Sequence, residues 1–311
     1  MASWADRALV TGAAGFVGRR LVGRLRGLGI DVEQCDLSLG SDIRHADLDA
    51  LVPERGIVFH LAAVVGVTNV LRAPEDTWST TVEGTEAVLR AALDRGATVV
   101  FTSSSEVYGD GKGEKLDERR SLPGDYGAWP RAAYPQSKLV AESLVLDFCQ
   151  RGGNGRIARL FNVAGPEQDS AGGMVLPTLV ERALEGLPLP VVGDGSDVRC
   201  FQHVDDAVSG LLALASEPAA RARIVNLGGT ESVTMRALAE RVRTVLDSRS
   251  PIEHVSDVER YGAPTTRCRH RVPDTSLARE LLGSWPEIDL DRTILDTARA
   301  ICAASRVTLA S

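Results

Sequence analysis

A glycine-rich turn between an apolar run and an amphipathic segment constrains the fold more than any other feature of the sequence. Residues 8–10 are apolar and predict a buried strand, and a T-G-x-x-G-x-x-G pattern follows over residues 11–18. Apolar residues then recur at helical spacing, at Val17, Leu21, Leu25 and Leu28. Glycine lets a backbone approach a pyrophosphate, and a helix N-terminus supplies free N–H groups and a positive dipole end. The stretch therefore predicts a nucleotide site, although a tight strand-to-helix turn alone could show the same glycines.

The composition is that of an ordinary soluble globular protein. With 311 residues, the chain can form one large α/β domain or two interleaved ones. Its formal net charge of −7 argues against a nucleic-acid partner. No apolar stretch approaches the ~18 residues of a membrane span, and residues 1–7 lack the apolar core of a signal peptide. The five cysteines form no C-x-x-C pair, so we expect a cytoplasmic protein without a bound metal.

The residues that follow the glycine turn predict the cofactor. Residues 30–34 predict a second strand that ends near Asp36. An acidic residue about 20 positions past the glycines can bond both ribose hydroxyls of an adenosine. No arginine follows in residues 37–39 to receive a 2′-phosphate, so we expect NAD rather than NADP, unless Asp36 only begins a turn. Asp42 and Ile43 come after a short loop and could flank the adenine.

Two further strand ends carry small or polar residues. Residues 57–59 predict a buried strand that runs into H-L-A-A at residues 60–63, where small side chains let a cofactor lie against the backbone. We expect His60 to bond locally, since no Ser or Cys partner lies beside it in sequence. Residues 98–102 predict another strand, which runs into S-S-S-E-V-Y-G at residues 103–109. Hydroxyls and a carboxylate at this end of a parallel strand indicate the active face of the sheet, although a turn could also explain the serines.

A tyrosine and a lysine four residues apart form a candidate catalytic pair. After the long polar loop of residues 110–130, a helix begins near Arg131 and places Tyr134 and Lys138 on one face. A nearby ammonium favours the phenolate, so Tyr134 could act as an acid or a base near neutral pH. A Y-x-x-x-K spacing is common by chance, but this one follows a nucleotide site and a serine-bearing strand end.

Together these motifs resemble the extended short-chain dehydrogenase/reductases that act on nucleotide sugars. The resemblance continues through R-L-F-N-V-A-G-P at residues 159–166, V-G-D-G at 192–195, R-C-F at 199–201 and R-V-P-D at 271–274. It implies an α/β fold, a Rossmann-like doubly wound parallel sheet with a smaller interleaved α/β substrate lobe. The implied NAD-binding domain spans residues 1–163, joined by 201–229, and the implied nucleotide-sugar lobe spans residues 164–200 and 230–311.

The resemblance also implies roles for individual residues. Tyr134 would take the proton of a sugar 4-hydroxyl while C4 gives a hydride to NAD, Lys138 would lower the pKa of the tyrosine, and Ser104 would bond O4. Asn162 and Arg199 would hold the nucleotide and its diphosphate. The implied cofactor residues are Gly12, Gly15, Phe16, Val17, Asp36, Asp42, Ile43, Leu61, Ala62, Ala63, Ser103, Tyr134, Lys138 and Val163. The implied substrate residues are Ser105, Arg131, Asn162, Val175, Arg199 and Arg271.

The fate of the 4-keto sugar distinguishes three enzyme classes. A 4-epimerase returns the hydride to the other face, a 4,6-dehydratase loses water, and a decarboxylase loses CO2 because the 4-ketone makes a glucuronate a β-keto acid. S-E at residues 105–106, P-R-x-x-Y at 130–134 and Arg271 resemble UDP-glucuronate decarboxylases, with Glu106 and Arg271 as catalytic groups. We favour that reaction, giving UDP-xylose or its 4-keto form.

The other reactions stay open on the sequence alone. Many dehydratases carry an Asp where this chain has Ser105, which is too weak an acid for that role, but GDP-mannose dehydratases also show Ser-Glu. Some epimerases carry the matching arginine. A non-catalytic nucleotide sensor would be expected to lose Tyr134 or Lys138, and both are present.

The resemblance leads to two further expectations about the fold. Only residues 37–41 separate Asp36 from Asp42, so the strand that such proteins usually have there should be short or absent. In the family, two helices from each subunit form a four-helix contact, so we expect a homodimer. Those helices would be 77–92 and 134–150, with apolar contacts from Val82, Val88, Leu89, Leu144, Val145 and Phe148.

Overall fold

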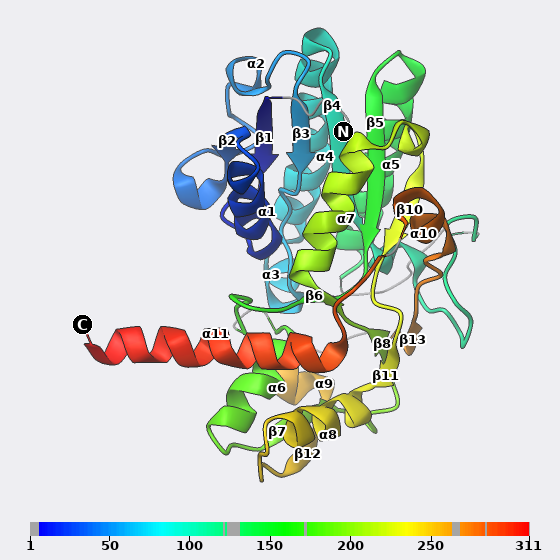
Figure 1. The fold of residues 1–311 in the computed structure, drawn as a ribbon. Coiled ribbons are helices and arrows are strands. Elements are labelled where there is room, and N and C mark those ends of the chain that lie inside the picture. Colours follow the sequence, from blue (N-terminus) through cyan, green and yellow to red (C-terminus); the bar gives the residue numbers. More distant parts are fainter. Residues whose placement is uncertain are drawn as a thin grey trace.

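A six-stranded parallel sheet forms the centre of the fold. The computed structural model describes residues 6–120, 122, 131–170, 173–262, 268–283 and 285–310. The strands lie in the order β10-β5-β4-β3-β1-β2, and every neighbouring pair is parallel (Figure 1). Their bounds are β1 Arg7–Thr11, β2 Asp31–Cys35, β3 Ile57–His60, β4 Thr98–Ser104, β5 Asn154–Leu160 and β10 Ile224–Leu227. Because β2 and β3 lie on opposite sides of β1, the strand order reverses there, which is where such sheets bind ligands.

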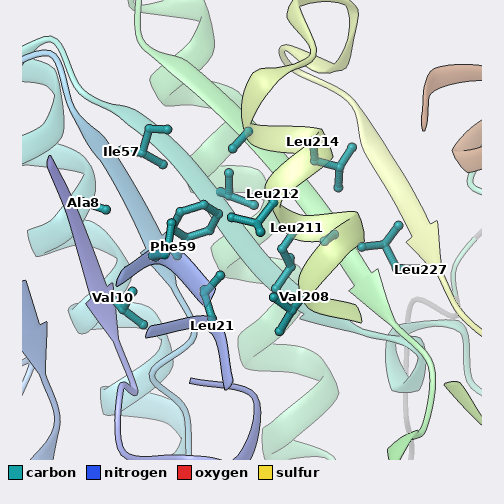
Figure 2. Close-up of a cluster of buried hydrophobic side chains, with 14 of the residues drawn as sticks. Ala8, Val10, Leu21, Ile57, Phe59, Val208, Leu211, Leu212, Leu214 and Leu227 are labelled. Atoms are coloured by element: carbon teal, nitrogen blue, oxygen red, sulfur yellow. The ribbon is translucent and has the colours of Figure 1, made fainter. Parts of the chain in front are cut away.

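Helices cover both faces of this sheet, which explains why its strands are apolar on both sides. The covering helices are α1 (Phe16–Gly27), α4 (Pro74–Arg95), α5 (Ala133–Gln150) and α7 (Val204–Ser216). One face packs against α1 and α7 in a cluster that includes Leu21, Phe59 and Leu211 (Figure 2). The other face packs against α4 and α5 around Val88 and Phe101. The expected Rossmann-like doubly wound sheet is confirmed.

The second half of the chain builds a smaller lobe at the carboxyl ends of the strands (Figure 1). Apolar side chains of α6, α8, α11 and β7 form its separate core. The elements of this lobe are α6 Val175–Leu184, β7 Leu189–Val192, β8 Val198–Cys200, β11 Ser232–Thr234, α8 Met235–Val245, β12 Ile252–Val255, α9 Asp257–Tyr261, β13 His270–Arg271 and α11 Leu290–Ala310. Two short strands, β6 (Val163–Ala164) and β9 (Gln202–His203), pair where the chain passes between the two parts.

One segment differs from the expected lobe boundaries. We expected the chain from residue 230 onward to belong to the substrate lobe, but α10 (Ser276–Leu282) packs on β10 and α7 against the large sheet. Ala278 of α10, and Trp285 beyond it, belong to the same buried apolar cluster as Leu21 and Phe59. The remaining short elements are η1 Leu37–Leu39, α2 Leu48–Leu51, α3 Val67–Arg72, η2 Ser105–Tyr108 and η3 Pro218–Ala220.

In the part of the chain that the structure describes, no helix combines the length and apolar character needed to cross a membrane.

The segment between Asp36 and Asp42 contains no strand, as expected. It forms the single turn η1, which Asp36 caps by accepting a hydrogen bond from the Ser38 N–H at 2.9 Å. Gly40 ends the turn in the left-handed region with φ +82°. The chain therefore passes from β2 to the next segment within a few residues.

Four of the six residues proposed for a dimer contact are instead part of the core. Val88, Leu89, Val145 and Phe148 are at most 6% exposed and pack between α4, α5 and the sheet. The reason is that an amphipathic helix beside a sheet buries its main apolar stripe against that sheet. The exposed large apolar residues of these helices are Trp78 and Val140, at 40% and 36%.

The turn after β1 depends on the absence of side chains at two glycines. Gly12 has φ +68°, and a Cβ there would lie 2.8 Å from the Ala62 nitrogen, against the segment that follows β3. Gly18 lies in the first turns of α1, where a Cβ would lie 2.0 Å from the Gly12 oxygen. The helix therefore packs directly onto the glycine turn.

Two alanine substitutions in α1, at Gly18 and at Gly23, should have opposite effects on the free energy of unfolding. Gly18→Ala should lower the free energy of unfolding by about 1–3 kcal/mol or more, because the methyl group overlaps the turn backbone. Gly23→Ala, in the same helix and with nothing within 4 Å of the new Cβ, should raise it by about 0.5–1 kcal/mol. Denaturant unfolding measures both, and a Gly18→Ala variant as stable as the wild type would contradict the packing.

Candidate active site

The carboxyl ends of β1, β3, β4 and β5 open into a cavity of about 920 Å³. Gly12 lines it from the turn after β1, Leu61 from the end of β3, Ser104 from the end of β4 and Leu160 from the end of β5. Arg199 and Arg271 reach the same cavity from the smaller lobe. The cavity therefore joins the glycine turn, the serine-bearing strand end and the substrate lobe.

The end of the cavity at β1 fits a dinucleotide. Gly15 caps α1 without a side-chain hydrogen bond, and the first turn of α1 holds no acidic residue. The N–H groups and the positive dipole end of α1 can therefore bind an anion such as a pyrophosphate. Asp36 lines the cavity after β2, where its carboxylate also accepts a hydrogen bond from the Ala14 N–H at 3.0 Å. Asp36 thus begins a turn and also reaches the nucleotide site.

Most of the predicted cofactor residues line the cavity, but three do not. Asp42 forms an ion pair with Arg44 at 2.7 Å, and hydrogen bonds from that guanidinium hold the pKa of Asp42 at about 2. Ile43 is buried in the core, and the Ala62 N–H donates to the Thr11 hydroxyl at 3.2 Å. The cofactor residues that line the cavity are Gly12, Gly15, Phe16, Val17, Asp36, Leu61, Ala63, Ser103, Tyr134, Lys138 and Val163.

His60 bonds locally, as expected. Its ring nitrogens lie 2.7 Å from the Thr11 hydroxyl and 3.0 Å from the Thr85 hydroxyl. Burial, together with the charge of Lys138, lowers the pKa of His60 to about 3, so the ring is neutral. His60 therefore ties β1, β3 and α4 together beneath the site.

The catalytic pair lies on the first turns of α5, facing the end of β4. Burial lowers the pKa of Lys138 to about 7, while the carboxylate of Glu142 acts in the opposite direction. The Lys138 ammonium donates a hydrogen bond to the Thr102 carbonyl at 2.8 Å. Burial and the charge of Glu106 raise the pKa of Tyr134 to about 12, although a hydrogen bond with Ser104 lowers it. The lowering of the tyrosine pKa by Lys138 stays a prediction, and in this structure burial and Glu106 outweigh it.

A carboxylate held by two guanidinium groups lies beside the catalytic pair. Glu106 forms an ion pair with Arg131, and its Oε1 lies 3.6 Å from Nη1 of Arg271. Burial alone would raise the pKa of Glu106, but these two cations hold it below its usual value. In the described part of the chain, Nε of Arg131 and Nε of Arg271 are buried and have no hydrogen-bond partner. Both arginines therefore retain a donor for an anionic ligand.

The smaller lobe brings two arginines together. β8 and β13 pair in parallel with Arg199 opposite Arg271. Nη2 of Arg199 donates to the Cys268 carbonyl at 2.6 Å, and burial together with the charge of Arg271 lowers the pKa of Arg199. Asn162 lines the cavity with φ +27° and donates to the Cys200 carbonyl at 2.8 Å. The strand pairing thus fixes the walls that would face a nucleotide sugar.

Several further side chains line the cavity without having been predicted. Among them are Arg19, Gln168, Arg260, Tyr261 and Cys268. Three of them, Arg260, Tyr261 and Cys268, reach the cavity only because the smaller lobe folds against the carboxyl ends of the strands. No spacing in the sequence indicates that placement. Ser105 and Val175, which we predicted, also line the cavity.

A nucleotide site at the reversal point of a parallel sheet, joined to a serine, a tyrosine and a lysine, is the arrangement expected of an extended short-chain dehydrogenase/reductase. A model of the NAD dependent epimerase/dehydratase family matches residues 8–228. The chain belongs to this family, and its cofactor is NAD. The family resemblance seen in the sequence is confirmed.

Two curated proteins and one solved structure are similar to most of the chain. The UDP-N-acetyl-α-D-glucosaminuronate decarboxylase of Bacillus cytotoxicus is 30% identical, over 94% of this chain and 96% of its own. UDP-glucuronic acid decarboxylase 1 of Arabidopsis thaliana is 34% identical, over 91% of this chain and 67% of its own. MoeE5, solved in complex with UDP-glucuronic acid and NAD, is 29% identical with a TM-score of 0.82, over 96% of this chain and 99% of its own.

Removing the carboxylate of Asp36 should reduce the preference for NAD over NADP. The charge of Asp36 repels a 2′-phosphate, so the ratio of the two dissociation constants should fall towards one in Asp36→Ala. Asp31→Ala is the matched control, because Asp31 lies on β2, the strand that Asp36 follows, but is exposed and pairs with Arg7. Calorimetric titration of both cofactors measures the ratio. Equal binding of NAD and NADP by the wild type would contradict the assignment.

Proposed function

We propose that this protein is an NAD-dependent decarboxylase of UDP-glucuronate or of its 2-acetamido counterpart. The observation that carries the proposal is the carboxylate of Glu106, only 15% exposed, between Arg131 and Arg271 and beside Tyr134. Each arginine keeps a free Nε donor, and a guanidinium is the side chain best suited to bind a carboxylate. The two related decarboxylases and the UDP-glucuronic acid complex of MoeE5 support the same substrate class.

Oxidation at C4 would begin the reaction. NAD, when bound, supplies the hydride acceptor and a positive charge that favours the phenolate of Tyr134. Tyr134 removes the proton of the 4-hydroxyl, and Ser104, to which it is hydrogen-bonded, holds O4. The Lys138 ammonium stays anchored on the Thr102 carbonyl at the end of β4. These groups act on the 4-hydroxyl of any hexose, so they set the first step and not the product.

The charges around C6 would decide the second step. Once C4 is a ketone, the carboxylate at C6 belongs to a β-keto acid, and its C5–C6 bond breaks with release of CO2. An arginine can hold the carboxylate before the bond breaks, and a second can help return a proton to C5. The lowered pKa of Glu106 keeps this side chain ionised, so it orients the arginines or a water molecule and does not serve as an acid in the resting site.

A UDP-glucuronate 4-epimerase is the second candidate. In that reaction Arg131 and Arg271 would only grip the carboxylate and the diphosphate, and C4 would be reduced on its other face. The same free donors on both arginines would support it. A dehydratase is less well supported, because the position before Glu106 is a buried serine, which is too weak an acid for a departing 6-hydroxyl.

A variant of the residue that acts in the first step should lose a different part of the reaction than variants of the residues that act in the later step. Tyr134→Phe should abolish all consumption of UDP-glucuronate while NAD still binds, since only the proton acceptor is lost. Glu106→Gln and Arg271→Gln should still oxidise C4, so reduced cofactor should accumulate on the enzyme while CO2 release falls. Acid–base groups contribute about 10²–10⁴-fold, so both effects are measurable by absorbance and CO2 capture.

Two outcomes of these measurements would contradict the proposed order of steps. Reduced cofactor that accumulates in Tyr134→Phe would show that another group removes the 4-hydroxyl proton. A Glu106→Gln variant that releases CO2 at the rate of the wild type would remove the carboxylate from the later step. Wild-type protein that converts UDP-glucuronate to UDP-galacturonate without losing CO2 would support the epimerase.

A homodimer through the outer faces of α4 and α5 also belongs to the proposal. Trp78 and Val140 are exposed on these helices, and Val82 and Leu144 are partly buried. Val140→Glu should weaken the dimer. Leu187→Glu should not, because Leu187 is a similarly exposed apolar residue that lies in the smaller lobe. Sedimentation at micromolar concentration measures both. A wild-type species of only 33.2 kDa would contradict the dimer.

A further inference from the structure

A buried ion pair lies one helical turn beyond Lys138. Nε and Nη2 of Arg159 donate to the two carboxylate oxygens of Glu142 at 2.8 and 2.7 Å. The two side chains are only 2% and 4% exposed. The Ser103 hydroxyl donates a third hydrogen bond to Glu142, at 2.5 Å. The carboxylate is therefore fixed in one position by three donors.

The sheet register explains why these groups meet. β4 and β5 pair with Ser103 opposite Arg159, so both side chains reach the same face of the sheet. α5 packs on that face and carries Lys138 and Glu142 four residues apart, which places them on one side of the helix. Because Lys138 donates to the carbonyl of Thr102, consecutive residues of β4 hold the lysine and the carboxylate.

In the part of the chain that the structure describes, the charges around Lys138 leave one anion, Glu142, to balance it. From β3, His60 is neutral, and from β4 the ring of Phe101 lies 4.7 Å below the ammonium. From β5, Arg159 adds a second buried cation. On α5 itself, Glu142 opposes the effect of burial, which brings the pKa of Lys138 down to about 7. A buried ammonium without a counter-charge loses its proton.

The neighbouring titratable groups do not balance the charge of Lys138. Glu106 on η2 is paired with Arg131 and Arg271. Tyr134, on the preceding turn of α5, is a neutral phenol because burial and the charge of Glu106 raise its pKa to about 12. Glu142 is therefore the carboxylate in the right place to act on Lys138.

We propose that Glu142 is a positioning residue: it is the counter-ion that keeps Lys138 a cation in the cavity, and Ser103 and Arg159 hold its carboxylate in place. It lies outside the cavity lining, so it touches neither cofactor nor sugar. Its importance for turnover rests on the proposed role of Lys138 in oxidation at C4. The charge of Lys138 can be measured without a substrate, so a failure of the proposed function leaves this inference testable.

Lysine NMR measures this charge directly. The chain contains only three lysines, and the other two, Lys112 and Lys115, are exposed. With 13C-labelled lysine in the full-length protein, one Cε resonance should titrate near neutral pH, and Lys138→Arg assigns it. In Glu142→Gln the titration of Lys138 should move about 1–3 pH units lower, the usual effect of removing an adjacent opposite charge.

A second variant keeps the test decisive if Glu142→Gln does not fold. In Glu142→Met/Arg159→Met both charges of the buried pair are replaced by apolar side chains, a change that proteins often tolerate. The Lys138 titration should again move to lower pH, because Glu142 acts on Lys138 more strongly than Arg159 does. Asp206→Asn is the matched control, since Asp206 is a buried carboxylate on α7 that binds the backbone N–H groups of Glu287 and Ile288.

The thermal midpoint of each variant distinguishes a purely structural role of Glu142 from its role as the counter-ion of Lys138. A purely structural carboxylate would lower the midpoint in Glu142→Gln while the Lys138 resonance still titrates where it does in the wild type. That result, in either folded variant, would overturn the proposal. Asp206→Asn should lower the midpoint and leave the Lys138 titration unchanged, and a shift of similar size in this control would also overturn it.

Discussion

All six strands of the large sheet run in one direction, and the site depends on that constraint. Parallel pairing delivers every carboxyl end to one edge, so residues far apart in the sequence meet there. Gly12, Ser104 and Leu160 lie at the ends of three different strands and line one cavity. The close packing of α1 on the glycine turn leaves no room for a side chain at Gly12 or Gly18. The smaller lobe closes the opposite wall with β8 and β13.

One end of the cavity is rich in cations, although the whole protein is acidic. The chain carries a formal net charge of −7, yet Arg131, Arg199 and Arg271 gather around the carboxylate of Glu106, with Asp197 at 4.0 Å from Arg199. A UDP-hexuronate brings a diphosphate and a carboxylate, so this local excess of cations fits its charge. Burying several cations is unfavourable unless anions lie close to them. The Glu142–Arg159 pair under α5 belongs to that supporting layer.

The sequence predicted the features that depend on neighbours along the chain. The glycine turn, the first strands, the missing strand after Asp36 and the tyrosine–lysine helix each follow from local spacing, and they agree with the structure. The family resemblance added the parallel sheet and the substrate lobe. The individual roles of the site residues stay predictions, although most of these residues line one cavity.

Features that depend on tertiary packing could not be predicted from spacing alone. Ile43 follows the ribose acid closely in sequence, but it packs under α4 against Gly84. Val88 and Val145 have the spacing of an apolar contact face, but that face covers the sheet. Burial and the charge of Glu106, which reaches Tyr134 from another segment, raise the pKa of Tyr134. Cys268 and Tyr261 enter the cavity only through the fold of the smaller lobe.

The fate of C6 distinguishes decarboxylation from epimerisation. Wild-type protein with NAD is incubated with UDP-glucuronate labelled with 13C at every sugar carbon, and the products are identified by mass and NMR. We expect 13CO2 and a UDP-pentose with five labelled carbons, or its 4-keto form. A product that retains all six labelled carbons, such as UDP-galacturonate, would contradict decarboxylation.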